Sequence, residues 1–378
     1  MMTSQKNAQQ QETRVAAIAV STSATASLSG SRDVDRHPET PSPQQRLFEN
    51  FAEACLRFTP RIALRSPHAG IFLDLAGCRW KQEQQPQLSA RIRSLARRFF
   101  GPQQQQPPIR IGFGPDPFSA WAAATLTNTG SSGGDGKSFP IEALSLLENP
   151  FAEPTPDRLR RLETLILVPL RALGITTFDQ YQKLSAGEVA SRFGKEGLLL
   201  HQRARLSELS FQRWPRFTPP EKILEERDVS DPESGLGLIG LEPLLFQMRP
   251  ICDRFFARLH AQGMRLSALR LELVFPTMDA TASRQWRISL AVPQGSTHGL
   301  LPLLATRLAT DLDRAPLPAP IEAVRLEAIE RVPGRGAQRG LLNPDELENN
   351  DAWDALLGRL REKLSEKPHL VDPNLADG

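Results

Sequence analysis

The chain has 378 residues, 40% of them hydrophobic, and a formal net charge of +3 at pH 7. It is long enough for two or three folded domains with real cores. The nearly balanced charge still leaves room for local basic faces, so nucleic acid is a permitted partner that composition alone does not indicate.

The cysteines and the apolar runs indicate the cellular compartment of the protein. Cys55, Cys78 and Cys252 are far apart and lack a CxxC or CxxxxH companion, which argues against a disulfide framework or a zinc site and indicates a reduced protein. Residues 1–30 fit neither a signal peptide nor a transit peptide, and the apolar run at 162–174 is too short to span a bilayer. We therefore expect a cytoplasmic protein with no membrane contact, no metal and no cofactor.

Residues 1–42 are rich in Gln, Ser, Thr and Ala and predict a disordered tail, with residues 14–21 as one short strand. An α/β layer is expected from residue 43 to 156, because apolar residues recur there at helical or alternating spacing. The expected helices are 44–58, 88–100 and 117–126, and the expected strands are 61–65, 70–77 and 109–114.

Residues 157–212 predict a helical domain in which two helices meet at a tight turn containing Gly174. Thr177 is placed to cap the second helix. A helix-hairpin-helix of this kind can present the backbone N–H groups of Gly174, Ile175, Thr176 and Thr177 to a DNA phosphate. A plain helical turn in a small bundle explains the same residues equally well.

After a linker at 213–223, the pattern predicts strand, helix, strand, strand, helix and strand between residues 224 and 333. The order βαββαβ is that of a split βαβ or ferredoxin-like unit, in which both helices cover one face of the sheet. The long helix, Leu241 to Gln262, contains Pro250, which is expected to kink it.

Alternation along three of these strands places arginines on the uncovered face. Arg270, Arg287 and Arg325 lie opposite leucines, isoleucine, valine and tryptophan that point toward the helices. These arginines are candidate contacts to DNA phosphates. The alternative is a solvated face on which Glu272 and Glu327 dilute the positive charge.

The tail at 334–378 contains the pentapeptide Gln338-Arg339-Gly340-Leu341-Leu342 and then an amphipathic helix. One amide and two apolar anchors, Gln338, Leu341 and Leu342, suit a groove on another protein. A second such pentapeptide, Gln44 to Phe48, falls on the apolar stripe of a helix, which favours a packing role.

Several segments resemble one family when taken in order: "CLRFTPRIAL", "GIFLDLAGC", "RIGFGPDPFSAWAAA", "LRALGITTFDQYQKLSAGEVASRFG" and the βαββαβ unit. They are similar to the Y-family (UmuC-like) translesion DNA polymerases, and within these to the catalytically inactive, ImuB-like branch of bacterial mutagenesis proteins. The resemblance implies a truncated palm at 43–156 without fingers, a thumb at 157–212 and a little finger at 224–333.

Active members of that family keep an adjacent pair of acids in a segment resembling S-I-D-E-A-F-L-D. Aligning Phe72-Leu73-Asp74 with the end of that segment places Ala69 and Gly70 where the acids belong. The strand at 14–21 has no acid either, and about two dozen low-complexity residues after it are too few for a fingers subdomain. Polymerase chemistry needs about three carboxylates around two metal ions, so Asp74 is interpreted as a structural strand-end residue.

The resemblance implies an accessory protein of DNA damage tolerance, not an enzyme. Its partners would be DNA, the β sliding clamp through Gln338, Leu341 and Leu342, a RecA-like mutagenesis protein and an error-prone polymerase, and it would associate with the nucleoid. The alternatives are a protein-interaction module without DNA binding, and a residual polymerase that uses rearranged acids such as Asp33, Asp35 or Asp116.

Overall fold

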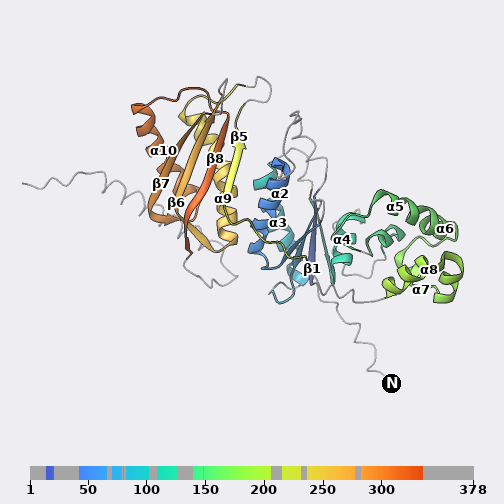
Figure 1. The fold of residues 1–378 in the computed structure, drawn as a ribbon. Coiled ribbons are helices and arrows are strands. Elements are labelled where there is room, and N and C mark those ends of the chain that lie inside the picture. The colour runs from blue at the N-terminus through green and yellow to red at the C-terminus, as the bar shows by residue number, and fades with distance from the viewer. Residues whose placement is uncertain are drawn as a thin grey trace, which may run out of the picture. The chain divides into compact units, whose positions relative to one another are not determined.

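The computed structural model describes residues 14–20, 42–65, 70–78, 80, 82–101, 109–126, 139–147, 149–205, 215–230, 236–276 and 282–334. The chain forms two compact units, Met1–Pro219 and Pro220–Gly378. Each contains helices and one antiparallel sheet of four strands (Figure 1), which confirms the expected mixed α/β architecture. No described helix is long and apolar enough to cross a membrane.

The sheet of the first unit has the order β2-β3-β1-β4. Its strands are β1 (Val15–Val20), β2 (Ile62–Arg65), β3 (Gly70–Asp74) and β4 (Ile109–Gly114). The inner position of β1 corrects one boundary, because the α/β layer starts before residue 43. All but one residue of β1 is buried, since its neighbours and the helices on both faces remove it from water.

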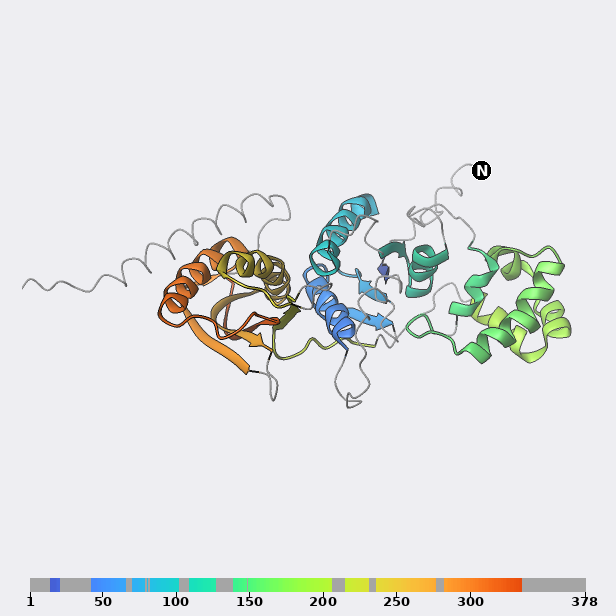
Figure 2. The same ribbon diagram turned by 90° about the horizontal axis from the view of Figure 1, so that it is seen from above.

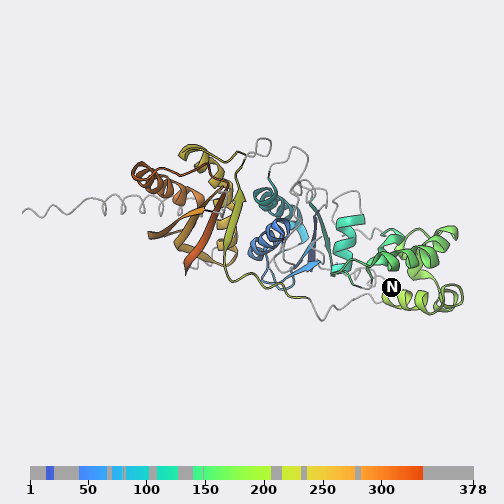
Figure 3. The same cartoon turned by 45° about the horizontal axis from the view of Figure 1, so that its top comes forward.

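Two helices cover one face of this sheet and one lies against the other face (Figures 1 and 2). They are α2 (Pro43–Ala54), which runs into the 3₁₀ turn η1 (Cys55–Arg57), α3 (Gln85–Phe100) and, on the opposite face, α4 (Pro117–Leu126). Helices α2 and α3 lie side by side (Figure 3), joined by ring contacts of Phe51 with Phe99 and Phe100. These segments match the helices expected from apolar spacing.

The helical segment packs on the α4 side through one continuous apolar core that includes Phe118, Leu170 and Tyr181. Its elements are η3 (Ile141–Leu146), α5 (Pro156–Leu162), the π-helical turn η4 (Glu163–Leu167), α6 (Val168–Ala172), α7 (Phe178–Lys183) and α8 (Ala186–Arg205). Gly194 has φ 63° and interrupts α8, so a second helical stretch begins there.

The second unit has the expected order of elements. These are β5 (Leu224–Asp228), α9 (Leu241–Ala261), β6 (Met264–Phe275), β7 (Ala282–Gln294), α10 (Thr297–Arg314) and β8 (Ala323–Pro333). Apolar residues of α9 and α10 form one core with Leu269, Leu271 and Leu326 of the sheet, so both helices cover one face. Helix α9 continues through Pro250.

The strand order corrects the ferredoxin-like assignment. The order is β5-β8-β6-β7, so the second and fourth strands are the inner pair, whereas the first and third are inner in a ferredoxin-like sheet. Both βαβ connections are still split by an intervening strand. The short strand β5, with the sequence LEERD, suits an edge because charged side chains protect an edge from pairing with another chain.

A buried ion cluster attaches β5 to α9. Glu225 is 1% exposed and accepts hydrogen bonds from Arg254 Nε at 3.1 Å and Arg258 Nη1 at 3.0 Å. Arg258 Nη1 also donates to the carbonyl of Leu224 at 2.7 Å. Because both arginines are buried with it, the carboxylate is the group that offsets their desolvation.

We therefore expect Glu225→Gln to destabilise the second unit by about 3–5 kcal/mol, because it leaves two buried cations without their counter-charge. The matched control is Glu226→Gln, which removes the partly exposed partner of Arg325 and should cost at most about 1 kcal/mol. Hydrogen exchange of the β5 and α9 amides along a urea series measures both. Equal losses in the two variants would contradict this account.

Candidate functional site

The strand end at Gly70 is where the resemblance places catalytic acids. Gly70 of β3 lies opposite Ala19 of β1 and Arg65 of β2 in the sheet register. A Cβ atom on Gly70 would lie 2.2 Å from the Trp121 ring, so the indole of α4 occupies the space of any side chain at this position. Ala69, the other half of the expected pair, lies outside the described residues.

A buried cation lies beside this indole. Arg65 is 3% exposed, its guanidinium lies 4.7 Å from the centre of the Trp121 ring, and its Nη1 donates to the carbonyl of Pro150. Its Nε has no hydrogen-bond partner. Burial lowers the pKa of Arg65, and the charge of Glu153 acts in the opposite direction. A buried guanidinium repels divalent cations, so this strand end is chemically unlike a two-metal site.

Asp74 lies at the other end of β3, and both of its carboxylate oxygens are engaged. Oδ2 accepts a hydrogen bond from Arg61 Nη1 at 3.1 Å, and Oδ1 accepts one from the backbone N–H of Ala76 at 3.0 Å. The Thr59 hydroxyl donates to the Asp74 carbonyl. These contacts fix the turn after the strand. Among the described residues, no group of three or more His, Cys, Asp or Glu side chains could hold a metal ion.

Asp116, one of the acids considered for a residual polymerase, caps α4. Its carboxylate accepts hydrogen bonds from the backbone N–H and the hydroxyl of Ser119, both at 2.8 Å. Burial raises the pKa of Asp116, and these hydrogen bonds oppose the rise. The geometry is that of a helix N-cap. Asp33 and Asp35 lie outside the described residues.

The turn at Gly174 has the predicted shape, but its backbone N–H groups already donate hydrogen bonds within the same segment. Gly174 has φ 77°, and Thr177 forms a capping box with Gln180. The N–H groups of Gly174 and Ile175 donate to carbonyls of α6, at 2.9 and 3.0 Å. Those of Thr176 and Thr177 donate to Gln180 Oε1, at 2.8 and 3.2 Å. A phosphate at this turn would have to displace one of these bonds.

The three predicted arginines do share the uncovered sheet face, and each has a carboxylate partner. Arg270 pairs with Glu327 at 2.6 Å and Arg287 with Glu330 at 3.0 Å. Arg325 lies between Glu226 at 2.9 Å and Glu272 at 3.4 Å. Arg270 and Arg287 lie directly opposite each other on β6 and β7, but each of the three arginines is paired with a carboxylate, so the face is not a basic surface.

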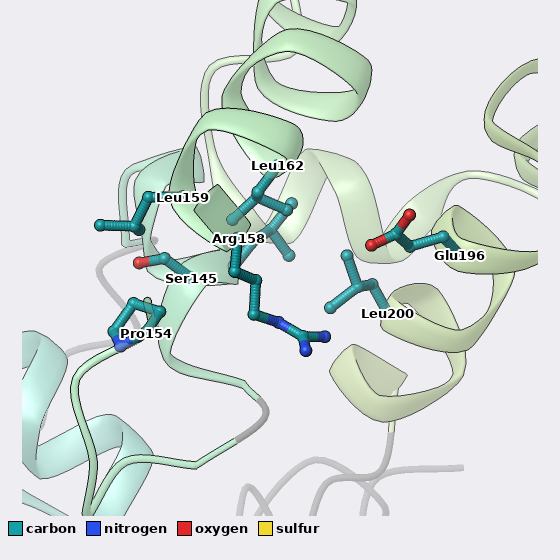
Figure 4. Close-up of a pocket in the computed structure, with 8 residues that line it drawn as sticks. Ser145, Pro154, Arg158, Leu159, Leu162, Glu196 and Leu200 are labelled. Atoms are coloured by element: carbon teal, nitrogen blue, oxygen red, sulfur yellow. The ribbon is translucent and has the colours of Figure 1, made fainter. Parts of the chain in front are cut away.

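A cleft between α5 and α8 is lined by Leu144, Ser145, Pro154, Arg158, Leu159, Leu162, Glu196 and Leu200. Arg158 and Glu196 reach into it from opposite helices (Figure 4). Its volume of about 20 Å³ suffices for about one water molecule. The cleft is therefore far too small for a nucleotide.

Two features of the structure were not predicted from the sequence. The burial of Arg65 followed only from long-range packing, although three apolar residues before it in β2 gave a weak signal. The other is the basic surface of α3, whose sequence has four arginines and no acid.

The predicted clamp-binding residues Gln338, Leu341 and Leu342 lie outside the described residues.

Gly70→Ala should destabilise the first unit by about 1–3 kcal/mol, because the added methyl group overlaps the Trp121 ring in a packed core. Gly187→Ala is the matched control, since a Cβ atom there meets nothing within 4 Å and helix propensity makes the change neutral or stabilising by up to about 1 kcal/mol. Urea unfolding followed by tryptophan fluorescence compares the two. A neutral Gly70→Ala variant would show that Trp121 moves easily from this position.

No family model and no curated protein matches this chain. One similar solved structure is described as "Y-family DNA polymerase chimera Dbh-Dpo4(243-245)-Dbh". It has a TM-score of 0.29 and 12% sequence identity, and the match covers 75% of this chain and 76% of that one. At this TM-score the likeness carries no argument about the fold or function of this protein.

Proposed function

We propose that this chain is a catalytically inactive, polymerase-like accessory protein of DNA damage tolerance and induced mutagenesis. The observation that supports the loss of chemistry is the strand end at Gly70, where Trp121 fills the side-chain space and Arg65 buries a positive charge. Two-metal phosphoryl transfer needs converging carboxylates. The sequence resemblance to the ImuB-like branch supplies the polymerase-like part of the proposal.

In this role the protein bridges components instead of catalysing a reaction. Gln338, Leu341 and Leu342 bind the β sliding clamp, other surfaces hold DNA, and a RecA-like mutagenesis protein and an error-prone polymerase complete the assembly at the nucleoid. Two modest contacts on one chain raise the overall affinity when the geometry allows both at once. A scaffold of this kind needs no active site.

A second candidate function is a protein-interaction module that does not bind DNA. The pairing of Arg270, Arg287 and Arg325 with carboxylates and the internal hydrogen bonds of the Gly174 turn favour it. The salt dependence of DNA affinity separates the two functions, because binding through phosphates weakens steeply as salt rises.

Primer extension should be absent when the purified chain is given a primed template, nucleotides and Mg²⁺ or Mn²⁺, because the described residues offer no carboxylate set that could hold two metal ions. A polymerase of known activity on the same template is the positive control. Extension that co-elutes with the chain, and that an Asp116→Ala variant loses, would overturn the proposal in favour of a residual enzyme.

Clamp binding should depend on the pentapeptide in the tail. Titration of the sliding clamp of the same organism into the full-length protein should give saturable binding. A variant with Gln338→Ala, Leu341→Ala and Leu342→Ala should bind at least about tenfold more weakly, since it lacks the amide and both apolar anchors. The matched control, Arg339→Ala, changes a position between the anchors and should bind like the wild type. Equal binding by all three proteins would remove the tail from this role.

A further inference from the structure

Five arginines lie on η1 and α3, Arg57 of η1 and Arg91, Arg93, Arg97 and Arg98 of α3. Arg57, Arg91, Arg97 and Arg98 are exposed, and Arg93 is half-buried. Helix α3 contains no acidic residue. Within the part of the chain that the structure describes, none of the five makes an ion pair or a hydrogen bond through its side chain.

The contrast with the second unit is informative. On its open sheet face every one of the three arginines has a carboxylate within 3.0 Å. Among the described residues no carboxylate pairs with the arginines of α3 and η1, so these arginines give the surface a positive charge. Surfaces of this kind attract polyanions.

Two of these arginines are held in place by aromatic rings. The Arg91 guanidinium lies 5.7 Å from the centre of the Trp80 ring, and that of Arg57 lies 5.7 Å from the centre of the Phe58 ring. Trp80 Nε1 donates a hydrogen bond to the Phe58 carbonyl at 3.2 Å, which links the two rings. The stacking leaves the guanidinium N–H groups of Arg91 and Arg57 available, because a cation–π contact does not use them.

Interaction with the helix dipole explains only part of the arginine cluster. Arg97 and Arg98 lie in the last turn of α3, where cations interact favourably with the helix dipole. Arg57 lies in the last turn of η1, which continues α2, so the same effect applies to it, whereas Arg91 lies in the middle of α3 and gains nothing from a helix dipole. Partial burial of the Arg57 guanidinium lowers its pKa, and the charges of Arg98 and Arg91 lower it further. Arg91 and Arg98 therefore both repel Arg57, and an anion bound among them would relieve this repulsion.

We infer that Arg57, Arg91 and Arg98 bind the phosphate backbone of DNA without reading its sequence. This inference rests on the proposed function for the choice of DNA among polyanions. Arg98 follows Arg91 by seven positions in the α-helix, which is about 10.5 Å along the axis, so the two side chains reach different phosphates. Each guanidinium can bind phosphate oxygens through two N–H groups. The N–H groups of the Gly174 turn and the arginines of the sheet face already have partners within the protein. The surface of η1 and α3 would therefore supply the DNA contact.

The test is a fluorescence anisotropy titration of the full-length protein into a labelled 20–30 base-pair primer–template at several salt concentrations. Arg91→Gln with Arg98→Gln should lower the affinity at least about tenfold at ~0.1 M salt, and it should reduce the slope of log K against log salt by about 2, one for each lost phosphate contact. The matched control is Arg270→Gln with Arg287→Gln, which removes two arginines that already have carboxylate partners and should bind like the wild type.

Three outcomes would overturn the inference: equal losses in the two double variants, a loss confined to the control, and no DNA binding by the wild type. Arginine-dependent binding to vesicles containing anionic lipid in the absence of DNA binding would also overturn it. Thermal unfolding is the check on folding, since losing one cation–π contact and one helix-dipole interaction at exposed arginines should lower the melting temperature by no more than a few degrees. Clamp titration decides the proposed function separately, so either idea can fail alone.

Discussion

The close approach of α4 to the first sheet is the constraint on which the rest of that unit depends. A Cβ atom on Gly112 would lie 2.3 Å from the carbonyl oxygen of Ala120, and one on Gly114 would lie 2.6 Å from the Ala120 nitrogen. Glycine in β4 and alanine in α4 therefore let helix and strand touch through their backbones. At this distance the large Trp121 side chain has to project over Gly70, where β3 has no side chain of its own.

This packing stabilises the strand end at Gly70. The Trp121 ring also contacts Phe72 and Arg65, and Phe72 packs against Phe151. Aromatic burial of this extent contributes more stabilisation than a cluster of acids could, because like charges close together in a dry site destabilise the fold unless metal ions neutralise them. A strand end filled in this way gains rigidity where a metal site would need an open, acidic cavity.

The elements could be predicted from sequence because each depends on local periodicity. Helices α2, α3 and α4 and the six elements of the second unit lie close to the expected residues, and Thr177 caps α7 as its position predicted. Strand order could not be predicted this way, since it depends on pairings between residues far apart, such as Glu272 with Arg325. The inner position of β1 and the burial of Arg65 have the same origin. Alternation likewise placed Arg270, Arg287 and Arg325 on one face, but only the three-dimensional structure revealed that each forms an ion pair with a glutamate.

Whether each arginine is paired with an acid matters more for DNA binding than the number of arginines. An arginine paired with a glutamate contributes little net field, because the two opposite charges nearly cancel. Four arginines on one helix without an acid produce a net positive field within about one Debye length, which is about 10 Å at 0.1 M salt. Charged side chains therefore have to be assigned to partners before a basic surface is recognised, and the surface of α3 with Arg57 qualifies where the open sheet face does not.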